Sequence, residues 1–347
     1  MTDESFALCR EITKRSGSNF ARCFCLLSEE KRLGMEALYA FMRVTDDWAD
    51  SEGTTASDNL AALKKEECAD ASFRQKLLTD WQNRVENALS GAAEDSPPPP
   101  ALAANAALAS NVRLLPALRE TVQRFKIDPA DILAAVEGCR EDCTPAVRFE
   151  TEADSFAYCD KVATSVGRAT LAILGLKKPW SGALENGALG CGRAFQWTNF
   201  LRDAREDAFR GRLYFPMSDF ARVRLDPIDF LALFTRYPPE RALCRFRLAD
   251  RRDPLTQFLT RQFERTDALY RQSEPLFAAL PNDSARFLRL MIRVYRTIFE
   301  KIKKKPEAIF EKRVRLSFWD KLRVILAKKP EIGNHRFTQI EDTDRHG

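Results

Sequence analysis

Residues 196–216 of the chain read QWTNFLRDAREDAFRGRLYFP, and this stretch decides the fold that we predict. Within it, Asn199, Asp203 and Asp207 recur at every fourth residue of a segment that is suited to a helix. This spacing places three oxygen donors on one helix face, about 6 Å apart along the axis. Because carboxylates at that separation repel each other, we expect a cation beside them.

A lone pair of carboxylates four residues apart is more often a solvated face, balanced here by the arginines of the same segment. Two features favour a metal cluster instead. Asn199 is an uncharged oxygen donor in register with the carboxylates, and a second pair, Asp46 and Asp50, lies far upstream in another apolar helical pattern. Two facing acidic helices predict a site for a hard cation.

The upstream acidic helix carries further polar residues. Tyr39, Arg43, Asp46 and Asp50 are spaced four, three and four residues apart and therefore share one stripe, whereas Asp47 points about 100° away. A purely structural role stays open for the first two residues. Tyr39 is also consistent with a half-buried core tyrosine, and Arg43 with an ion-pair partner of Asp46 or Asp47.

Composition excludes several kinds of site. The nine cysteines are odd in number and contain no CxxC pair, so we expect reduced thiols and neither a disulfide framework nor a zinc ribbon. The only histidines, His335 and His346, lie in the polar C-terminal tail. This disfavours a Ser-His-Asp or Cys-His hydrolase and a histidine-ligated zinc site. The net charge of +5 suits anionic ligands.

The periodicity of apolar residues predicts an all-α protein, because no convincing alternating strand is present. We expect a single domain over residues 1–330 and a polar tail over 331–347, with the proline-rich segment 91–100 as a surface loop. The predicted helices cover residues 5–50 with a break at 16–19, 60–89, 101–125, 129–141, 254–277 and 284–305.

Two stretches of the chain are rich in small residues. Residues 163–167, ATSVG, permit close helix packing, which is the commoner case, or leave room for a ligand. The glycines of residues 182–193 lack the strand and the GxGxxG spacing of a dinucleotide site.

The sequence shows neither an apolar run of eighteen residues nor an N-terminal leader, so we expect a cytoplasmic protein. Basic residues alternate with aromatic ones over residues 301–330. Such a run is usually a solvated face; peripheral contact with the inner face of a membrane is the alternative. We expect no nucleic-acid partner.

Four segments carry a family resemblance. They are SGSNFARCFCLLSEEKRLGMEALYAFMRVTDDWAD (16–50), YCDKVATSVG (158–167), QWTNFLRDAREDAFRGRLYFP (196–216) and RVYRTIF (293–299). The chain resembles the squalene/phytoene synthase family, the head-to-head type of trans-isoprenyl diphosphate synthase. The resemblance implies an isoprenoid-synthase-like helical bundle around a deep apolar cavity, with the two aspartate segments facing each other across its mouth.

The resemblance also implies roles for individual residues. Catalytic roles fall to Tyr158 and the four aspartates. Mg²⁺, with Mn²⁺ as the alternative ion, would be held by Asp46, Asp50, Asn199, Asp203 and Asp207. Substrate diphosphate would meet Ser16, Gly17, Ser18, Asn19, Tyr39, Arg43, Arg202, Arg212 and Arg293. The cavity near the reacting carbons would be lined by Tyr158, Val166, Gly167 and Gln196.

The implied reaction is a Mg²⁺-dependent 1′-1 condensation of two prenyl diphosphates. The first segment and the late RVRLSFWDKLRVIL stretch most resemble bacterial hopanoid-pathway enzymes, which make presqualene diphosphate from two farnesyl diphosphates. Alternatives are a phytoene synthase that uses geranylgeranyl diphosphate and a full squalene synthase. No nicotinamide motif is visible, so we do not expect NADPH.

A non-catalytic scaffold would be expected to lose metal ligands, and all five are present. The RDxxED block with GRxYxP argues against head-to-tail elongation or terpene cyclisation.

Overall fold

The computed structural model describes residues 2–49, 71–91, 111–143, 148–235, 250–317, 319–320 and 324. Asp50, residues 92–100 of the predicted proline loop, the tail 331–347 and the first parts of two predicted helices, 60–70 and 101–110, lie outside these residues. The predicted domain boundaries therefore stay predictions.

Every regular element of the described residues is helical, and the single β-bridge there, between Phe149 and Pro216, is isolated. The all-α prediction is confirmed. The elements are α1 (Thr2–Arg15), α2 (Asn19–Arg22), the 3₁₀ turn η1 (Cys23–Leu26), α3 (Glu29–Ala49), α5 (Ala71–Ser90), the 3₁₀ turn η2 (Val112–Leu114), α8 (Leu115–Phe125), α9 (Pro129–Glu141), α10 (Glu152–Cys159), the π-helical turn η3 (Asp160–Thr164), α11 (Ser165–Leu174), α12 (Gly182–Phe209), α13 (Met217–Val223), α14 (Pro227–Thr235), α16 (Pro254–Gln272), α17 (Pro275–Ala279), α18 (Asn282–Lys304) and α19 (Ala308–Glu311).

Local signals set the helix ends that matter for the site. The chain breaks between α1 and α2 at Gly17, whose φ of +60° is a conformation that glycine adopts without strain. Helix α9 begins after Asp128, whose carboxylate accepts from the Ala130 N–H at 2.9 Å. Both the predicted break and the predicted start are confirmed.

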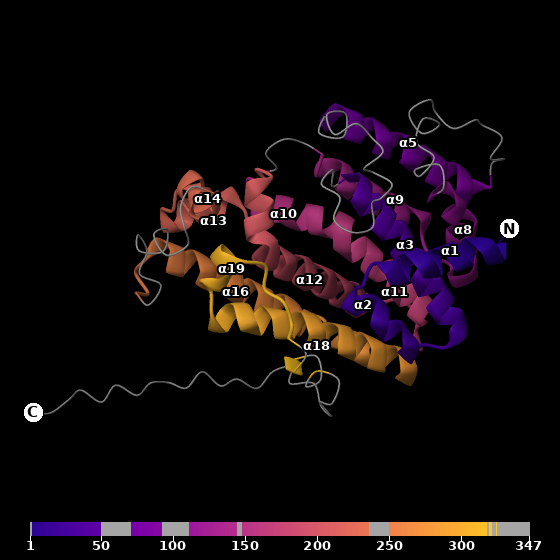
Figure 1. Cartoon of the computed structure of the whole chain (residues 1–347). Coiled ribbons are helices and arrows are strands. Elements are labelled where there is room, and N and C mark those ends of the chain that lie inside the picture. Colours follow the sequence, from indigo (N-terminus) through magenta and orange to yellow (C-terminus); the bar gives the residue numbers. More distant parts are fainter. Residues whose placement is uncertain are drawn as a thin grey trace, which may run out of the picture.

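Helix α12 is the centre of the molecule (Figure 1). It packs against α10, η3, α11, α14, α16, α17, α18 and α19. Glycines allow this close approach: a Cβ on Gly192 would lie 2.7 Å from the Cα of Thr164, and a Cβ on Gly190 would lie 2.5 Å from the Cβ of Gln272. The glycine-rich segment 182–193 thus serves helix packing.

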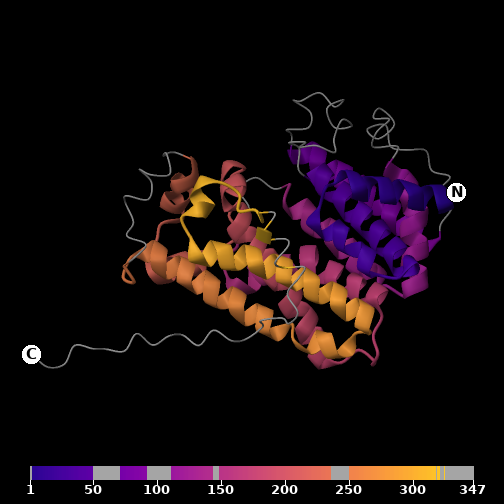
Figure 2. The same cartoon turned by 60° about the horizontal axis from the view of Figure 1, so that its bottom comes forward.

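Helices α16 and α18 run along one side of α12 (Figure 2). Aromatic side chains fill the space between them, and the Tyr270 and Phe299 rings lie 5.9 Å apart. Polar atoms within this layer are paired: the Thr198 hydroxyl lies 2.9 Å from the Tyr270 hydroxyl, and the Trp197 indole N–H donates to Gln262 at 3.1 Å. The helix that bears the aspartate motif is therefore rigidly held.

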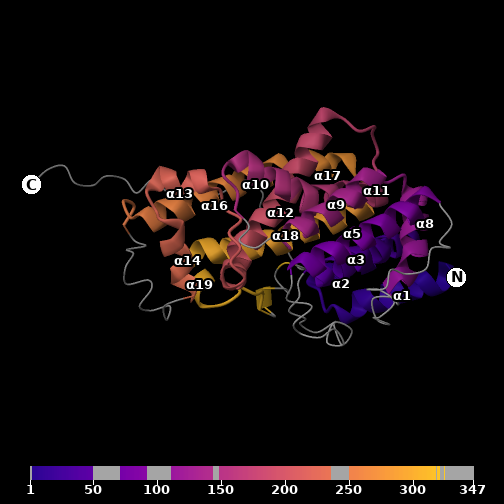
Figure 3. The ribbon, with the colours of Figure 1, turned by 90° about the horizontal axis from the view of Figure 1, so that it is seen from above.

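The two ends of the molecule differ. Seen from above, α3, α5 and α9 lie side by side at one end, whereas α13, α14 and α19 gather at the other (Figure 3). None of the described helices is both long and apolar enough to cross a membrane. Membrane contact through the basic C-terminal region, the alternative interpretation of that run, stays a prediction.

The seven cysteines within the described residues are free thiols, and all except Cys25 are buried. Burial raises the pKa of the Cys191 thiol to about 12. For these residues the prediction of reduced, core-filling cysteines is confirmed.

An ion-pair cluster joins α9, α11 and α12. Arg168 Nη2 lies 2.5 Å from a Glu185 oxygen and its Nε lies 3.3 Å from the other, whereas Nη1 makes a single contact with Asp131 at 3.2 Å. The hydrogen bond from Arg168 is the main cause that lowers the pKa of Glu185. Burial outweighs Arg168 at the other carboxyl and raises the pKa of Asp131 from 3.8 to about 6.

We expect Asp131→Asn to remove a pH dependence of stability. The raised pKa means that the folded protein binds more protons than the unfolded chain between pH 3.8 and about 6, so stability falls as pH rises through that window. We therefore compare the free energy of unfolding of the wild type with that of Asp131→Asn. The difference between the two should fall by about 3 kcal/mol as the pH rises from 3.8 to about 6. Urea unfolding of both proteins at several pH values measures this difference, and a difference independent of pH would contradict the assignment.

Candidate active site

A cavity of about 430 Å³ lies between α3, η3, α11, α12 and α18. Its volume is within the range of small-molecule sites. Its walls are mainly apolar, with a group of polar side chains among them. The lining residues are Ser18, Met35, Leu38, Tyr39, Met42, Arg43, Val162, Ala163, Val166, Gly167, Thr170, Leu171, Ala188, Cys191, Gly192, Phe195, Gln196, Asn199, Arg202, Leu276, Phe287, Leu288, Met291, Tyr295 and Arg313.

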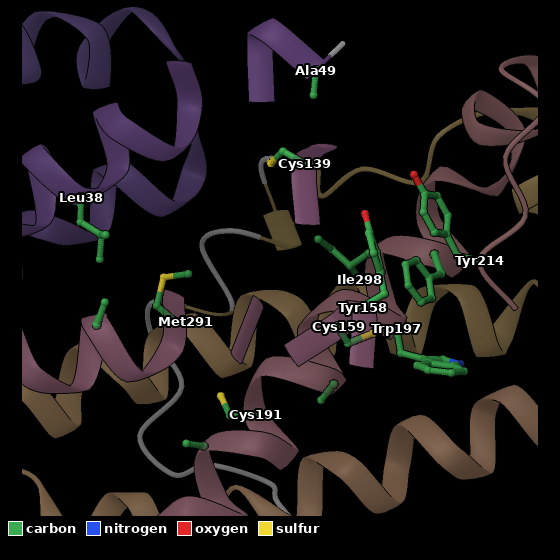
Figure 4. Close-up of a cluster of buried hydrophobic side chains, with 14 of the residues drawn as sticks. Leu38, Ala49, Cys139, Tyr158, Cys159, Cys191, Trp197, Tyr214, Met291 and Ile298 are labelled. Atoms are coloured by element: carbon green, nitrogen blue, oxygen red, sulfur yellow. The ribbon is translucent and has the colours of Figure 1, made fainter. Parts of the chain in front are cut away.

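The apolar wall is assembled from helices that are distant in sequence. Leu38 of α3, Cys191 of α12 and Met291 of α18 contribute to it, and Figure 4 shows them on neighbouring helices. A Cβ on Gly167 would meet no atom within 4 Å, so this residue leaves space in the cavity and is not required for close packing. Of the two interpretations of residues 163–167, room for a ligand therefore fits Gly167.

The π-helical turn η3 forms part of the wall through Val162 and Ala163. Such turns are rare and occur frequently at functional sites. Asp160 anchors this turn, because it accepts from Thr164 Oγ1 at 2.9 Å and from Arg193 Nε at 2.8 Å. The turn is thus fixed to α12 by a charged hydrogen bond.

Asn199 and Gln196 bring polar atoms to the cavity from α12. The Asn199 side-chain N–H donates to Gln196 Oε1 at 3.1 Å. The other end of the amide, Asn199 Oδ1, is buried and has no hydrogen-bond partner among the described residues. A buried oxygen without a partner is costly, and a metal ion or a donor group of a ligand would satisfy it.

Asp203, one turn after Asn199, is shared by two arginines. Arg202 Nε and Nη2 lie 2.8 and 2.5 Å from its two oxygens, and Arg313 Nε lies 2.9 Å from one of them. Burial opposes the charge on Arg202, but the hydrogen bond and charge of Asp203 outweigh it and raise the pKa of Arg202 above its usual value. Both guanidinium groups line the cavity, which suits a ligand with anionic oxygens.

The α3 side of the cavity carries Tyr39 and Arg43. The Arg43 guanidinium pairs with Asp47, with 2.7 Å between Nη2 and Oδ1, so one of the two partners left open by the sequence is observed. Tyr39 is half-buried and its ring packs edge-on against Phe24. Ser18 reaches the cavity from the start of α2.

Eight of the predicted site residues therefore line one cavity. Others lie near it without lining it. Ser16 donates from its hydroxyl to the Thr13 carbonyl at 2.7 Å and, with Gly17, forms the turn before α2. Arg293 is half-buried on α18 and is not among the lining residues. Asn19 begins α2.

Of the predicted metal ligands, Asp50 lies outside the described residues. The described part of the chain contains no group of three or more His, Cys, Asp or Glu side chains placed to hold a metal ion. Asp46 is exposed and lies 3.4 Å from the Cys139 thiol. Burial, and then the charge of Asp203, raises the pKa of Asp207 well above its usual value, while nearby Arg212 lowers it. The metal assignment stays a prediction.

Tyr158 and Arg212 are not among the lining residues of the cavity. Both donate hydrogen bonds to the same residue, Asp142. The Tyr158 hydroxyl donates to the carboxylate of Asp142 at 2.8 Å, and Arg212 Nη2 donates to the Asp142 carbonyl at 2.7 Å. The sequence pattern does not single out Asp142. No spacing signal marks it, because it directly follows the end of α9.

Two cavity residues are likewise unmarked by the sequence pattern. Tyr295 lines the cavity and stacks on Phe195 with ring centroids 4.2 Å apart, and the charge of Arg202 partly offsets the burial that raises its pKa. It belongs to the RVYRTIF segment, from which the resemblance selected Arg293. These two residues point about 200° apart on a helix, so only one of them can face the cavity directly. Arg313 lies in a basic run whose pattern suggested a solvated face or membrane contact.

The sequence match extends over nearly the whole chain. Residues 13–320 match the model of the family described as squalene/phytoene synthase. The chain belongs to the squalene/phytoene synthase family. Members of this family are prenyltransferases that join prenyl diphosphates head to head, and the chain is an enzyme of this class.

Similar proteins agree with this assignment. The chain is 28% identical to 15-cis-phytoene synthase of Synechococcus elongatus over 92% of its own length and 90% of the relative's, and 28% identical to phytoene synthase of Arthrospira platensis with the same coverage. Among solved structures, a dehydrosqualene synthase matches with a TM-score of 0.70 and 21% identity over 93% of this chain and 95% of that one. Squalene synthase HpnC from Alicyclobacillus acidocaldarius matches with a TM-score of 0.64 and 21% identity over 87% and 94%. These two structures support the isoprenoid-synthase fold.

Proposed function

We propose that this squalene/phytoene synthase condenses two farnesyl diphosphates 1′-1 to presqualene diphosphate, with release of one diphosphate. The observation that carries the proposal is the cavity itself. Its apolar walls suit prenyl chains, and Arg43, Arg202 and Arg313 stand among its lining residues as groups for diphosphate oxygens. The first family segment and the late RVRLSFWDKLRVIL stretch, which resemble hopanoid-pathway enzymes, support the farnesyl substrate.

The donor chemistry of the site fits Mg²⁺. Asn199 Oδ1 is a buried oxygen without a partner among the described residues, and Asp203 and Asp207 follow on the same helix. Mg²⁺ prefers carboxylate, carbonyl and phosphate oxygens. These three residues, with Asp46 and Asp50, would hold the ion. When bound, Mg²⁺ neutralises diphosphate charge and so makes diphosphate a better leaving group.

The arginines have the next role. Arg202 and Arg313 already share the Asp203 carboxylate, so a diphosphate at the cavity would bind to guanidinium groups that are held in place before it arrives. They stabilise the negative charge that develops as the allylic C–O bond of the first substrate breaks.

The apolar wall protects the carbocation. The double bond of the second prenyl diphosphate attacks this cation, and loss of one proton closes a cyclopropane ring to give the cyclopropylcarbinyl diphosphate. Leu38, Met291 and Phe287 line the chamber with apolar groups that exclude water from the cation. The released diphosphate is a sufficiently strong base, and it is close enough to the cation, to accept this proton.

Condensation of two geranylgeranyl diphosphates to phytoene is the second candidate. The two relatives reported above are phytoene synthases, and this supports geranylgeranyl diphosphate as the substrate. The support is equal to that which the sequence segments give to farnesyl diphosphate. The two candidates share the site, the first ionisation and the cyclopropyl intermediate. They differ in the length of chain that the cavity admits and in whether the intermediate reacts further.

One assay separates these candidates. Purified protein is incubated with Mg²⁺ and either farnesyl or geranylgeranyl diphosphate, with and without NADPH, and products are identified by mass spectrometry. We expect presqualene diphosphate from farnesyl diphosphate, unchanged by NADPH. Preferential formation of phytoene would establish the second candidate, and squalene that forms only with NADPH would establish a full squalene synthase. Absence of any coupled product would refute the proposed function.

A further inference from the structure

Side chains from two segments converge on Asp142, the residue that follows α9. The hydroxyl of Tyr158, in α10, donates to both carboxylate oxygens at 2.8 and 3.0 Å. The hydroxyl of Tyr214, which follows α12, donates to one of them at 2.7 Å. Figure 4 shows the two hydroxyls pointing to the same side. Two tyrosines from different segments thus share one carboxylate.

The two tyrosines are buried and stacked. Tyr158 and Tyr214 are 3% and 6% exposed, and their ring centroids lie 5.2 Å apart. Burial, and then the charge of Asp142, raises the pKa of each phenol well above 10. Both hydroxyls therefore keep their protons at neutral pH. A phenol has a single proton, and in each tyrosine it is directed at Asp142.

The C-terminal end of α9, which Asp142 follows, also lies between the two aspartate segments. Cys139, in the last turn of α9, contacts Asp46 of the first segment with 3.4 Å between sulfur and Oδ1. The Asp142 carbonyl accepts from Arg212, whose backbone N–H donates to the Asp207 carbonyl of the second segment at 2.9 Å. The turn therefore joins the two segments that the proposed function places around diphosphate.

From this geometry we infer that Asp142 is a positioning residue for the condensation, an inference that rests on the proposed function. It fixes the proton direction of Tyr158, so that the phenol oxygen is left only as an acceptor. Tyr158 lies one turn before Val162, which lines the cavity. Tyr158 itself does not line the cavity. In a reaction that forms a carbocation and loses a proton, a phenol oxygen that only accepts lowers the energy of nearby positive charge, whereas a donor would not.

Asp142→Asn tests this role with little change in shape. An amide accepts at one position and donates at the other, so one of the oxygens that now accepts from a phenol is replaced by an N–H. We expect kcat to fall about 10- to 100-fold, which corresponds to loss of a hydrogen bond to a charged group, with KM for the prenyl diphosphate nearly unchanged. Asp131→Asn, the same change at the other end of α9, is the matched control and should leave kcat unchanged.

A double-mutant cycle separates positioning from a merely structural effect. If Asp142 acts through Tyr158, Tyr158→Phe together with Asp142→Asn should be no slower than the slower single variant. Thermal unfolding of all variants checks that the fold is retained. The inference would be overturned if the loss in kcat of the double variant equalled the product of the two single losses. It would also be overturned if Asp142→Asn were as active as Asp131→Asn. Wild type that forms no coupled product would instead refute the proposed function, so the two failures are distinguishable.

Discussion

Asp203→Asn is expected to lower kcat with either prenyl diphosphate by about a thousandfold while the protein stays folded. The Asp203 carboxylate is 18% exposed and holds both Arg202 and Arg313 in position. Removal of its charge weakens both ion pairs at once and also replaces one of the predicted carboxylate ligands with a neutral amide. The amide has nearly the same size, so packing around α12 is preserved.

Single-turnover and steady-state kinetics with circular dichroism measure this effect. Glu264→Gln on α16 is a suitable control, because Glu264 is exposed and does not line the cavity. It should have wild-type kinetics. An Asp203→Asn protein within threefold of wild type would contradict a role for this carboxylate in holding either the arginines or the metal.

Gly167→Leu is expected to lower kcat/KM by about a hundredfold, because the new side chain would fill space that the substrate needs. A Cβ at Gly167 meets no atom within 4 Å, so the helix tolerates the change, whereas the added branch reduces a cavity of about 430 Å³. If the two prenyl chains fill the cavity, the longer geranylgeranyl substrate should be affected more than the farnesyl one.

Gly192→Ala provides the contrast. Its added Cβ would lie 2.7 to 2.8 Å from the backbone of Thr164, so we expect a lower melting temperature from a smaller substitution. Comparison of melting temperatures and of kcat/KM for both substrates distinguishes the two glycines. A Gly167→Leu enzyme with unchanged kinetics on both substrates would show that the prenyl chains do not occupy this part of the cavity.

The sequence predicted those parts of the fold that depend on local signals. The break at Gly17 and the start of α9 at Asp128 follow from turn and capping chemistry within a few residues. The separation of four residues between Asn199 and Asp203 likewise places both on one face of α12. Such features need no knowledge of neighbouring helices, and the family segments then indicated which face is functional.

Contacts between distant segments could not be predicted in this way. Asp203 pairs with Arg313, which lies 110 residues further along the chain. Asp142 gathers Tyr158 and Tyr214, and no periodic pattern connects these three residues. The choice between Arg293 and Tyr295 depends on the rotation of α18 about its axis. Each of these depends on tertiary packing, which one sequence does not reveal.

The position of Arg313 also defines how much of the chain makes up the catalytic unit. This residue follows α19, and the Phe310 carbonyl of that helix accepts from Arg205 of α12 at 2.8 Å. Val314 and Leu316, just beyond it, are buried. A fragment that ends with α18 would keep both aspartate segments and the RVYRTIF segment, yet it would lack one of the cations that line the cavity. We therefore expect the minimal enzyme to extend past α18 and to include the segment that carries Arg313.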